Sequence, residues 1–313
     1  MTPPYERHLL QSRVWFEFQK VLGNDVIEIS SEAMSAYGVV EKSDGKFGKF
    51  FKRLYFPYGP TLDSKNKNKI LELIDEKARS IGVDYVRIEP ISGATSKWLS
   101  EKGYKKMSKS FQPSNTSVID LGSGWDKLLM EFRTSNRQGW RKAEAGALIF
   151  EKSQNIKDVD DFWKMLKDTE SRTSTHMKSK DYFVTMVEFI LKNRCGELIF
   201  AVHEGKRIAS TIVFDDVEQR CRYYLYAASY PEARKLDAGA SLVSFTIKDA
   251  IDSGLAYYDL FGVSPPDAPQ DHRWYGFSKF KRSFAGNDVE FLGDWEKTVT
   301  YRHKVLNVLR KLR

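Results

Sequence analysis

The sequence predicts an α/β (α+β) protein with two similar units, each a mixed, largely antiparallel sheet flanked by helices. The chain has 313 residues, enough for two domains. Apolar strand-like runs alternate with amphipathic helical segments along the chain. A helix closed by glycine and followed by an apolar strand occurs at residues 80–88 and again at 252–260. This repeat predicts two copies of one unit.

The elements around each copy follow the same order. In the first half, strands at 36–42 and 49–57 precede an amphipathic helix at 65–80. In the second half, strands at 197–203, 207–214 and 220–229 precede a helix at 234–253, with a tight turn at Glu204-Gly205. Antiparallel strands, a crossover helix and a further strand, occurring twice, are typical of tandem GNAT-like acyltransferase domains. A helix is predicted at 125–145, and the boundary between the two copies is expected after it, near residues 148–155.

Composition excludes several classes of protein. Two cysteines and five histidines show no disulfide framework and no metal-ligand spacing, so no metal is predicted. The chain lacks an apolar run long enough for a membrane span and an N-terminal signal segment, so a cytoplasmic protein is expected. An excess of 50 Lys and Arg over 42 Asp and Glu favours polyanionic partners such as tRNA, nucleotide diphosphates or a membrane surface, unless it serves solubility alone.

Two segments bear on phosphate binding. Arg133, Arg137 and Arg141 recur every fourth residue of the helix predicted at 125–145, which makes them candidate tRNA contacts or a solvated helix face. The segment 234–240 lies where a GNAT domain holds the pyrophosphate of acetyl-CoA, but Leu236 and Asp237 match that loop poorly. We therefore expect no cofactor.

A set of motifs resembles the FemABX peptidyltransferase family. The C-terminal part carries Tyr257-Tyr258-Asp259-Leu260-Phe261-Gly262, an FKxxF core at Phe280-Lys281-Arg282-Ser283-Phe284, and Val289 to Trp295. Earlier pieces occur in the family's order: Gln11-Ser12 with Trp15, Pro57-Tyr58-Gly59-Pro60, Gln112-Pro113 with Thr116 and Asp120-Leu121, and Arg141-Lys142-Ala143-Glu144 with Gly146. The resemblance spans nearly the whole chain and fits the short, FemX-like members, because residues 158–194 show no heptad run for a coiled-coil arm.

The resemblance implies an aminoacyltransferase that uses aminoacyl-tRNA as co-substrate. It would move Gly, Ala or Ser to the stem peptide of a peptidoglycan precursor, either UDP-MurNAc-pentapeptide or lipid II. It also implies domains of 1–149 plus 290–313 and of 150–289. We expect a cytoplasmic monomer with peripheral contact at the inner membrane surface.

The resemblance also assigns candidate residues. Lys281, with Phe280 beside it, would stabilise the oxyanion formed when an amine attacks the tRNA ester. Phe277, Phe280 and Phe284 would form one apolar strip next to the lysine. The alternative is an ordinary core helix from which Lys281 extends to solvent.

Substrate contacts are assigned in the same way. Lys178 and Tyr182, in a Lys-x-x-x-Tyr segment, and Tyr226 would contact the precursor, with Lys20 a weaker candidate. Either tyrosine could instead belong to the sheet core. Glu89 is a candidate general base, or a turn residue before Pro90.

Two other functions remain open. One is a GNAT-related N-acyltransferase that uses acyl-CoA or aminoacyl-tRNA on another amine. The other is a non-catalytic tRNA- or membrane-binding module, suggested by Lys178 and by the basic run Lys304, Arg310, Lys311 and Arg313.

Overall fold

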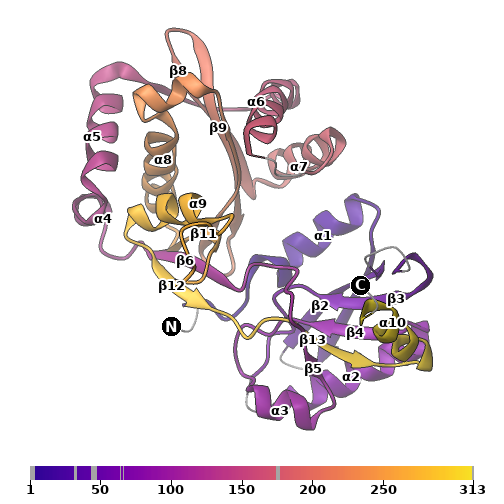
Figure 1. The fold of residues 1–313 in the computed structure, drawn as a ribbon. Helices are drawn as coiled ribbons and strands as arrows, with labels where there is room; N and C mark the ends of the chain where they lie inside the picture. Colours follow the sequence, from indigo (N-terminus) through magenta and orange to yellow (C-terminus); the bar gives the residue numbers. More distant parts are fainter. Residues whose placement is uncertain are drawn as a thin grey trace. The chain divides into compact units, whose positions relative to one another are not determined.

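The computed structural model describes residues 4–31, 34–43, 48–63, 65, 67–173 and 177–311. Within these ranges the chain forms two compact units, Met1–Ser114 with Glu290–Arg313 and Asn115–Val289 (Figure 1). The first division lies at residue 114 rather than at the predicted 149. The reason is strand pairing over long sequence distance: strand β6 (Asn115–Asp120) pairs antiparallel with β11 (Tyr257–Val263) of the second unit.

The first unit is built on a six-stranded sheet of order β1-β2-β3-β4-β13-β5. Only β3 and β4 pair in parallel, and α2 connects them. This helix buries Ile70, Ile74 and Ala78, four residues apart, against the sheet. The elements are α1 (Arg13–Val21), β1 (Asp25–Ser31), β2 (Met34–Lys42), β3 (Lys52–Phe56), α2 (Lys67–Ile81), β4 (Tyr85–Ile88), α3 (Ser96–Glu101), β5 (Lys105–Lys106), β13 (Trp295–Thr298) and α10 (Tyr301–Lys311).

The second unit is built on a seven-stranded sheet of order β12-β6-β11-β10-β9-β8-β7. Its parallel pair is β10 and β11, connected by α8. Figure 1 shows α5 and α8 on one face of this sheet and α6 and α7 on the other. The remaining elements are α4 (Trp125–Glu131), α5 (Thr134–Lys142), β7 (Ile149–Lys152), α6 (Val159–Thr173), α7 (Lys180–Asn193), β8 (Gly196–His203), β9 (Lys206–Asp216), β10 (Cys221–Ser229), α8 (Ala238–Asp252), α9 (Tyr275–Lys281) and β12 (Asn287–Glu290).

The predicted fold class and its repeat are confirmed. Each unit carries antiparallel strands, then a 15-residue crossover helix and a strand parallel to the one before the helix. The tight turn between β8 and β9 also has the predicted form, since Glu204 and Gly205 both adopt positive φ. No helix in the described ranges is long and apolar enough to cross a bilayer.

The single helix predicted at 125–145 is wrong. The chain leaves helical geometry at Phe132, whose ψ is 151°, and begins α5 after Arg133. Two contacts hold this break: the Arg133 N–H donates to Ser283 O, and the Arg137 guanidinium donates to the carbonyls of Met130 and Phe132. These carbonyls have lost their helical partners, so the arginine closes the end of α4.

Candidate active site

The parallel pair of the second unit separates part of the way along its length. Residue pairs run from Cys221–Tyr257 to Tyr223–Asp259 along these fully described strands. Just beyond, β10 carries a bulge between Tyr224 and Tyr226. Such bulges re-aim side chains and end pairing, and they occur often beside active sites. The split between β10 and β11 is therefore the candidate active site.

Lys281 lies at this split. Its Nζ donates a hydrogen bond of 2.9 Å to the carbonyl of Gly262, three residues beyond the last paired residue of β11. The side chain is only 3% exposed, and Nζ lies 4.0 Å from the centre of the Phe277 ring. Burial lowers the pKa of Lys281 to about 7, although the negative charge of Asp259 acts in the opposite direction.

The three phenylalanines near Lys281 do not form the predicted single strip. Phe277 lies over the lysine and is half exposed. Phe280 instead packs with Phe284 in the core on the α8 side, with ring centres 5.3 Å apart. The difference arises because Phe277 and Phe280 are three residues apart within α9, so their side chains leave the helix about 60° apart. Phe280 therefore fixes the helix, and Phe277 screens the ammonium.

Three predicted substrate residues come together on the other side of the split. Tyr226, three residues beyond the last paired residue of β10, donates from its hydroxyl to that of Tyr182 on α7 (3.2 Å). Lys178 Nζ lies 5.7 Å from the centre of the Tyr182 ring. Burial, followed by the neighbouring Tyr226, raises the pKa of Tyr182, so both phenols remain protonated donors.

These groups and Asp259 share one face of the sheet. Tyr258 and Leu260 belong to the core on the α8 side, so alternation along β11 places Asp259 on the opposite face. Tyr226 faces that same side, since its ring contacts Phe183 of α7 at 4.9 Å. Asp259 is fully buried and accepts from the Thr116 hydroxyl and the Phe261 N–H. Sequence reasoning missed Asp259, although a lone acid within an apolar strand was visible.

The start of α8 differs from a pyrophosphate cradle. Asp237 precedes the helix in a left-handed conformation and forms a 3.6 Å ion pair with Lys142 of α5. Helix α5 approaches so closely that a Cβ on Gly139 would lie 2.8 Å from the Asp237 Cβ. A diphosphate here would meet a carboxylate and the packed helix. The expectation that the protein uses no cofactor stays a prediction.

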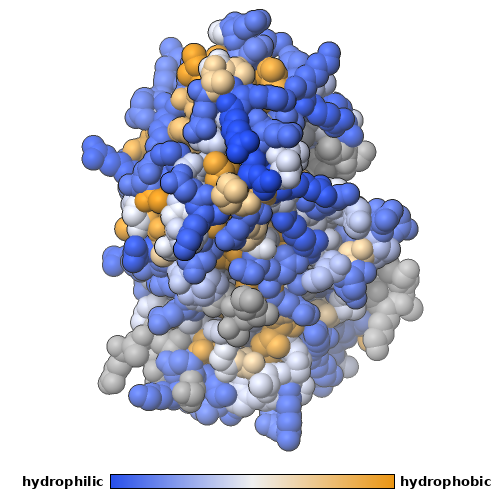
Figure 2. All heavy atoms as spheres, turned by 90° about the vertical axis from the view of Figure 1, so that its left-hand side faces the viewer, coloured by the Kyte–Doolittle hydropathy of each residue, from blue (hydrophilic) through white to orange (hydrophobic). Residues whose placement is uncertain are grey.

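The predicted arginine stripe is divided by the break between α4 and α5. Arg133 lines a cavity of about 460 Å³ with two further cations, Lys279 and Arg282. Arg137 closes the end of α4 instead of facing solvent for a ligand. Arg141 is exposed on α5. Figure 2 shows this side of the molecule as largely hydrophilic, with small, separate apolar patches.

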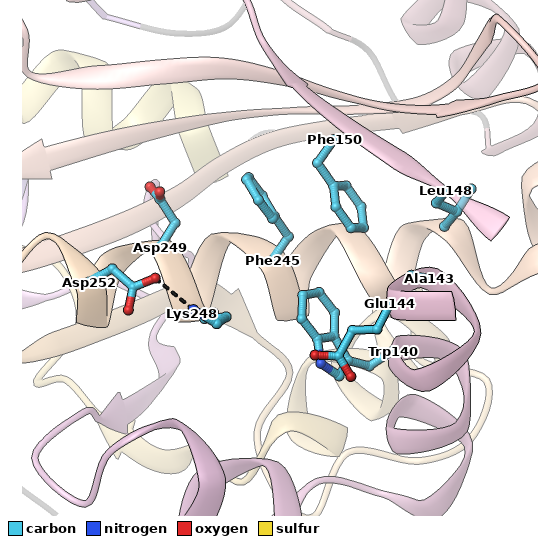
Figure 3. Close-up of a pocket in the computed structure, with 9 residues that line it drawn as sticks. All are labelled: Trp140, Ala143, Glu144, Leu148, Phe150, Phe245, Lys248, Asp249 and Asp252. Carbon is cyan, nitrogen blue, oxygen red and sulfur yellow. Dashed lines mark hydrogen bonds and ion pairs between the residues drawn. The ribbon is translucent and has the colours of Figure 1, made fainter. Parts of the chain in front are cut away.

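A second cavity in this unit, of about 300 Å³, contains none of the candidate residues (Figure 3). It lies between α5, β7 and α8, where the rings of Phe150 and Phe245 stack at 4.6 Å. Glu144, Asp249 and Asp252 contribute its carboxylates. Asp249 is paired with Arg222 at 2.7 Å and Asp252 with Lys248 at 2.8 Å, so ion pairs within the fold account for two of these three charges.

Two candidates lie in the first unit. Glu89 is buried and accepts from the Tyr55 hydroxyl (2.9 Å) and the Tyr58 N–H (3.1 Å). Burial, then the charge of Asp294 and a hydrogen bond with it, raises the pKa of Glu89 well above its usual value. These contacts make Glu89 a hydrogen-bonding centre of the unit, and its role as a base stays a prediction. Lys20 is exposed and pairs with Glu17 at 2.9 Å.

The N-terminal motif residues build the first unit. Gln11 is fully buried, and its amide donates to the carbonyls of Tyr37 (2.8 Å) and Pro57 (2.9 Å). A Cβ on Gly59 would lie 2.3 Å from the Gln11 side chain, which explains a glycine at this position. Ser12 caps α1 by accepting from the Trp15 N–H.

Two sheets with crossover helices and a parallel pair that separates define a tandem GNAT-like acyltransferase fold. The crystal structure of FemX has this arrangement, with a TM-score of 0.82 and 18% identity over 97% of this chain and 95% of that one. L-PGS from Bacillus licheniformis is similar with a TM-score of 0.61 and 13% identity, over 99% of this chain and 98% of that one. A tandem GNAT protein from the clavulanic acid biosynthesis pathway is similar with a TM-score of 0.53 and 9% identity, over 96% of this chain and 98% of that one.

The family model described as FemAB family matches residues 91–204 and 190–311, and the chain belongs to this family. No curated protein matches the chain. FemAB proteins are aminoacyltransferases, so this chain is a peptidoglycan-related aminoacyltransferase whose substrates are, in general terms, a peptidoglycan precursor and tRNA.

Proposed function

We propose that this enzyme transfers Gly, Ala or Ser from aminoacyl-tRNA to the stem peptide of UDP-MurNAc-pentapeptide or lipid II. The proposal includes a monomeric enzyme with peripheral contact at the inner face of the membrane. The observation that carries the proposed chemistry is the buried Lys281 at the split between β10 and β11. A cation held in a low-dielectric site is suited to an oxyanion that forms only during reaction.

The reaction needs no covalent enzyme intermediate, because the ester of aminoacyl-tRNA is already activated. The neutral acceptor amine attacks the ester carbon, a C–N bond forms, and the carbonyl oxygen becomes an oxyanion. When this intermediate collapses, the C–O bond to the ribose breaks. The proton lost by the amine ends on the ribose hydroxyl. The Lys281 ammonium would exchange its bond with Gly262 O for one with the oxyanion.

Lys178, Tyr182 and Tyr226 are proposed to bind the precursor. The two hydroxyls are hydrogen-bonded to one another, and the Lys178 ammonium lies 5.7 Å from the centre of the Tyr182 ring. Lysine supplies a point charge to a diphosphate, without the two parallel hydrogen bonds of an arginine. Arg133, with Lys279 and Arg282, is proposed to contact tRNA phosphates. Lys20 and Glu89 remain proposals for precursor binding and for proton removal.

Transfer of radiolabelled Gly, Ala and Ser from charged tRNA to both precursors tests the proposal. Lys281→Ala should lower kcat about 10²- to 10³-fold, the usual effect of removing an oxyanion donor. Lys248→Ala is the matched control, since this partly exposed lysine on α8 pairs only with Asp252 in the described contacts. Transfer from no charged tRNA, together with transfer from acetyl-CoA, would favour the acyl-CoA alternative.

The pH profile separates an oxyanion role from a base role. Only the neutral form of the acceptor amine attacks, and for an ordinary pKa of about 10.4 the neutral fraction rises about tenfold with each pH unit below that value. Since Lys281 loses its proton near pH 7, an oxyanion role predicts a rate that rises to about pH 7 and then levels off. Lys281→Arg keeps its charge, so its rate should continue to rise to pH 8.5. A wild-type rate that keeps rising above the midpoint measured for Lys281 by NMR would contradict the oxyanion role.

A further inference from the structure

Helix α10 of the first unit has a buried side and, opposite it, an exposed apolar side. His303 and Leu306 face the unit and are each 2% exposed, with the His303 ring stacked on Tyr85 at 4.2 Å. On the opposite side, Tyr301, Val305 and Val308 are 75%, 43% and 59% exposed. Their spacing of four and three residues places them within about 60° of arc. Among the described residues, the fold buries one side of α10 and leaves the side with Tyr301, Val305 and Val308 exposed.

A neighbouring segment extends this stripe. Phe50, in the 3-10 turn before β3, is 61% exposed. It lies next to α10, because the Arg302 guanidinium donates to the Phe50 carbonyl. We call Phe50, Tyr301, Val305 and Val308 the apolar stripe. Scattered apolar side chains are normal on protein surfaces, but here three lie on one side of a helix and a fourth on the adjoining turn.

Basic side chains surround the apolar stripe. Lys49 and Lys304 are exposed, and each lies over an aromatic ring of the stripe, Lys49 at 5.1 Å from Phe50 and Lys304 at 5.7 Å from Tyr301. From residue 297 to residue 313 the sequence contains six Lys and Arg and no Asp or Glu. An apolar side with flanking cations and aromatic rings is the pattern of a helix that lies in a membrane interface.

We propose that the apolar stripe docks on an anionic lipid surface, with Lys49 and Lys304 contacting the head groups. The absence of acidic residues over 297–313 supports an anionic partner, since a second copy would bring two positive surfaces together. RNA phosphates would pair with the cations but would leave Val305 and Val308 in water. A bilayer satisfies both the charged and the apolar groups. The inference rests on the proposed function in one respect: an enzyme docked on the membrane would reach a lipid-linked acceptor.

Flotation of the full chain with vesicles tests the docking. The protein should float with vesicles of phosphatidylglycerol and phosphatidylcholine, and much less with phosphatidylcholine alone. Added salt should weaken the binding, because exposed charges are screened. Lys304→Gln should weaken it about fivefold, the effect of one cation near an anionic surface.

The apolar contribution is tested by Val305→Gln combined with Val308→Gln. Both positions are exposed, so the fold should persist, which circular dichroism checks. We expect vesicle binding to fall about tenfold or more. Val217→Gln is the control, since this valine is 67% exposed in the second unit and should leave binding unchanged.

Several results would overturn the proposal. These are no flotation of the wild type, equal flotation of the double variant, or a wild-type dimer that the double variant dissociates. Binding of tRNA, and not of vesicles, to the apolar stripe would also overturn the proposal. Vesicle binding requires no transfer activity, so failure of the proposed reaction leaves this test intact. If both proposals hold, the double variant retains transfer to the soluble precursor and loses transfer to the lipid-linked one.

Discussion

The protonation of Lys281 links the candidate site to the stability of the protein. Burial lowers its pKa from 10.5 to about 7 in the folded chain. In the unfolded chain the lysine is solvated and keeps its ordinary value. Between these two values the unfolded state binds the extra proton, so stability rises with pH, and the gain is lost as pH falls towards 7. Lys281→Met keeps a side chain of similar length and removes this linkage.

The size of the effect follows from the two pKa values. A full unit of pH within the window corresponds to about 1.4 kcal/mol. From pH 7, where half of the folded molecules carry the proton, to pH 9, the unfolding free energy of the wild type should rise by about 2 kcal/mol relative to Lys281→Met. The lysine is 3% exposed, so solvent screening reduces this little.

Two measurements test this linkage. Urea unfolding at pH 7, 8 and 9 gives the difference between wild type and Lys281→Met. Carbon-13 NMR of lysine Cε, assigned by the signal that the variant lacks, gives the midpoint directly and is expected near pH 7. Asp259→Asn should move it lower, since Asp259 favours the charged form. A midpoint near 10.5, with parallel stability curves, would refute the buried ammonium.

Three further predictions concern the framework. Arg222 is 2% exposed between Asp215 (2.8 Å) and Asp249 (2.7 Å), so Arg222→Met should destabilise the second unit by about 3–5 kcal/mol in thermal unfolding, whereas a loss below 1 kcal/mol would contradict this. Glu89→Ala should cost about 1–3 kcal/mol by leaving buried donors unpaired, and Glu89→Gln less. Because the pKa of Glu89 is raised in the folded protein, its contribution to the free energy of unfolding is full below about pH 4.5 and is lost at higher pH. In urea unfolding, the difference in stability between the wild type and Glu89→Gln should therefore shrink as pH rises. Gly139→Ala should lower the free energy of unfolding by about 1–3 kcal/mol, because the new Cβ would meet the Cβ of Asp237. Asp237→Gly removes that second Cβ, so Gly139→Ala should cost much less stability in the double variant. Additive effects of the two substitutions would contradict the contact between these residues.

The features predicted from sequence are those set by local rules. The crossover helices and the β8–β9 turn follow from apolar spacing and from glycine at helix ends and turns, which act over a few residues. Phe132 ends α4 for a different reason, because its break depends on Ser283, more than 140 positions away. The place of β6 in the second sheet likewise depends on pairing with β11. Such contacts leave little local trace.

The candidate site shows the same limit. The FKxxF motif located Lys281, and the tyrosines 182 and 226 proved to be hydrogen-bonded partners. The spacing could not show that Phe280 faces the core while Phe277 covers the ammonium, since this depends on which side of α9 packs against the core. Asp259 and the Gly262 carbonyl acquire their significance from a bulged sheet, which a strand pattern does not reveal.

The contact between Gly139 and Asp237 constrains how such an enzyme could change its donor during evolution. A chain that came to use a thioester of a nucleotide would need a bare helix start, but removing the carboxylate alone leaves α5 in place, packed through Gly139. Withdrawing α5 alone would leave the carboxylate and uncover Trp125, which packs in the core against Trp140 of α5. The carboxylate of Asp237 and the close packing at Gly139 thus form one structural unit, whose two parts would have to change together.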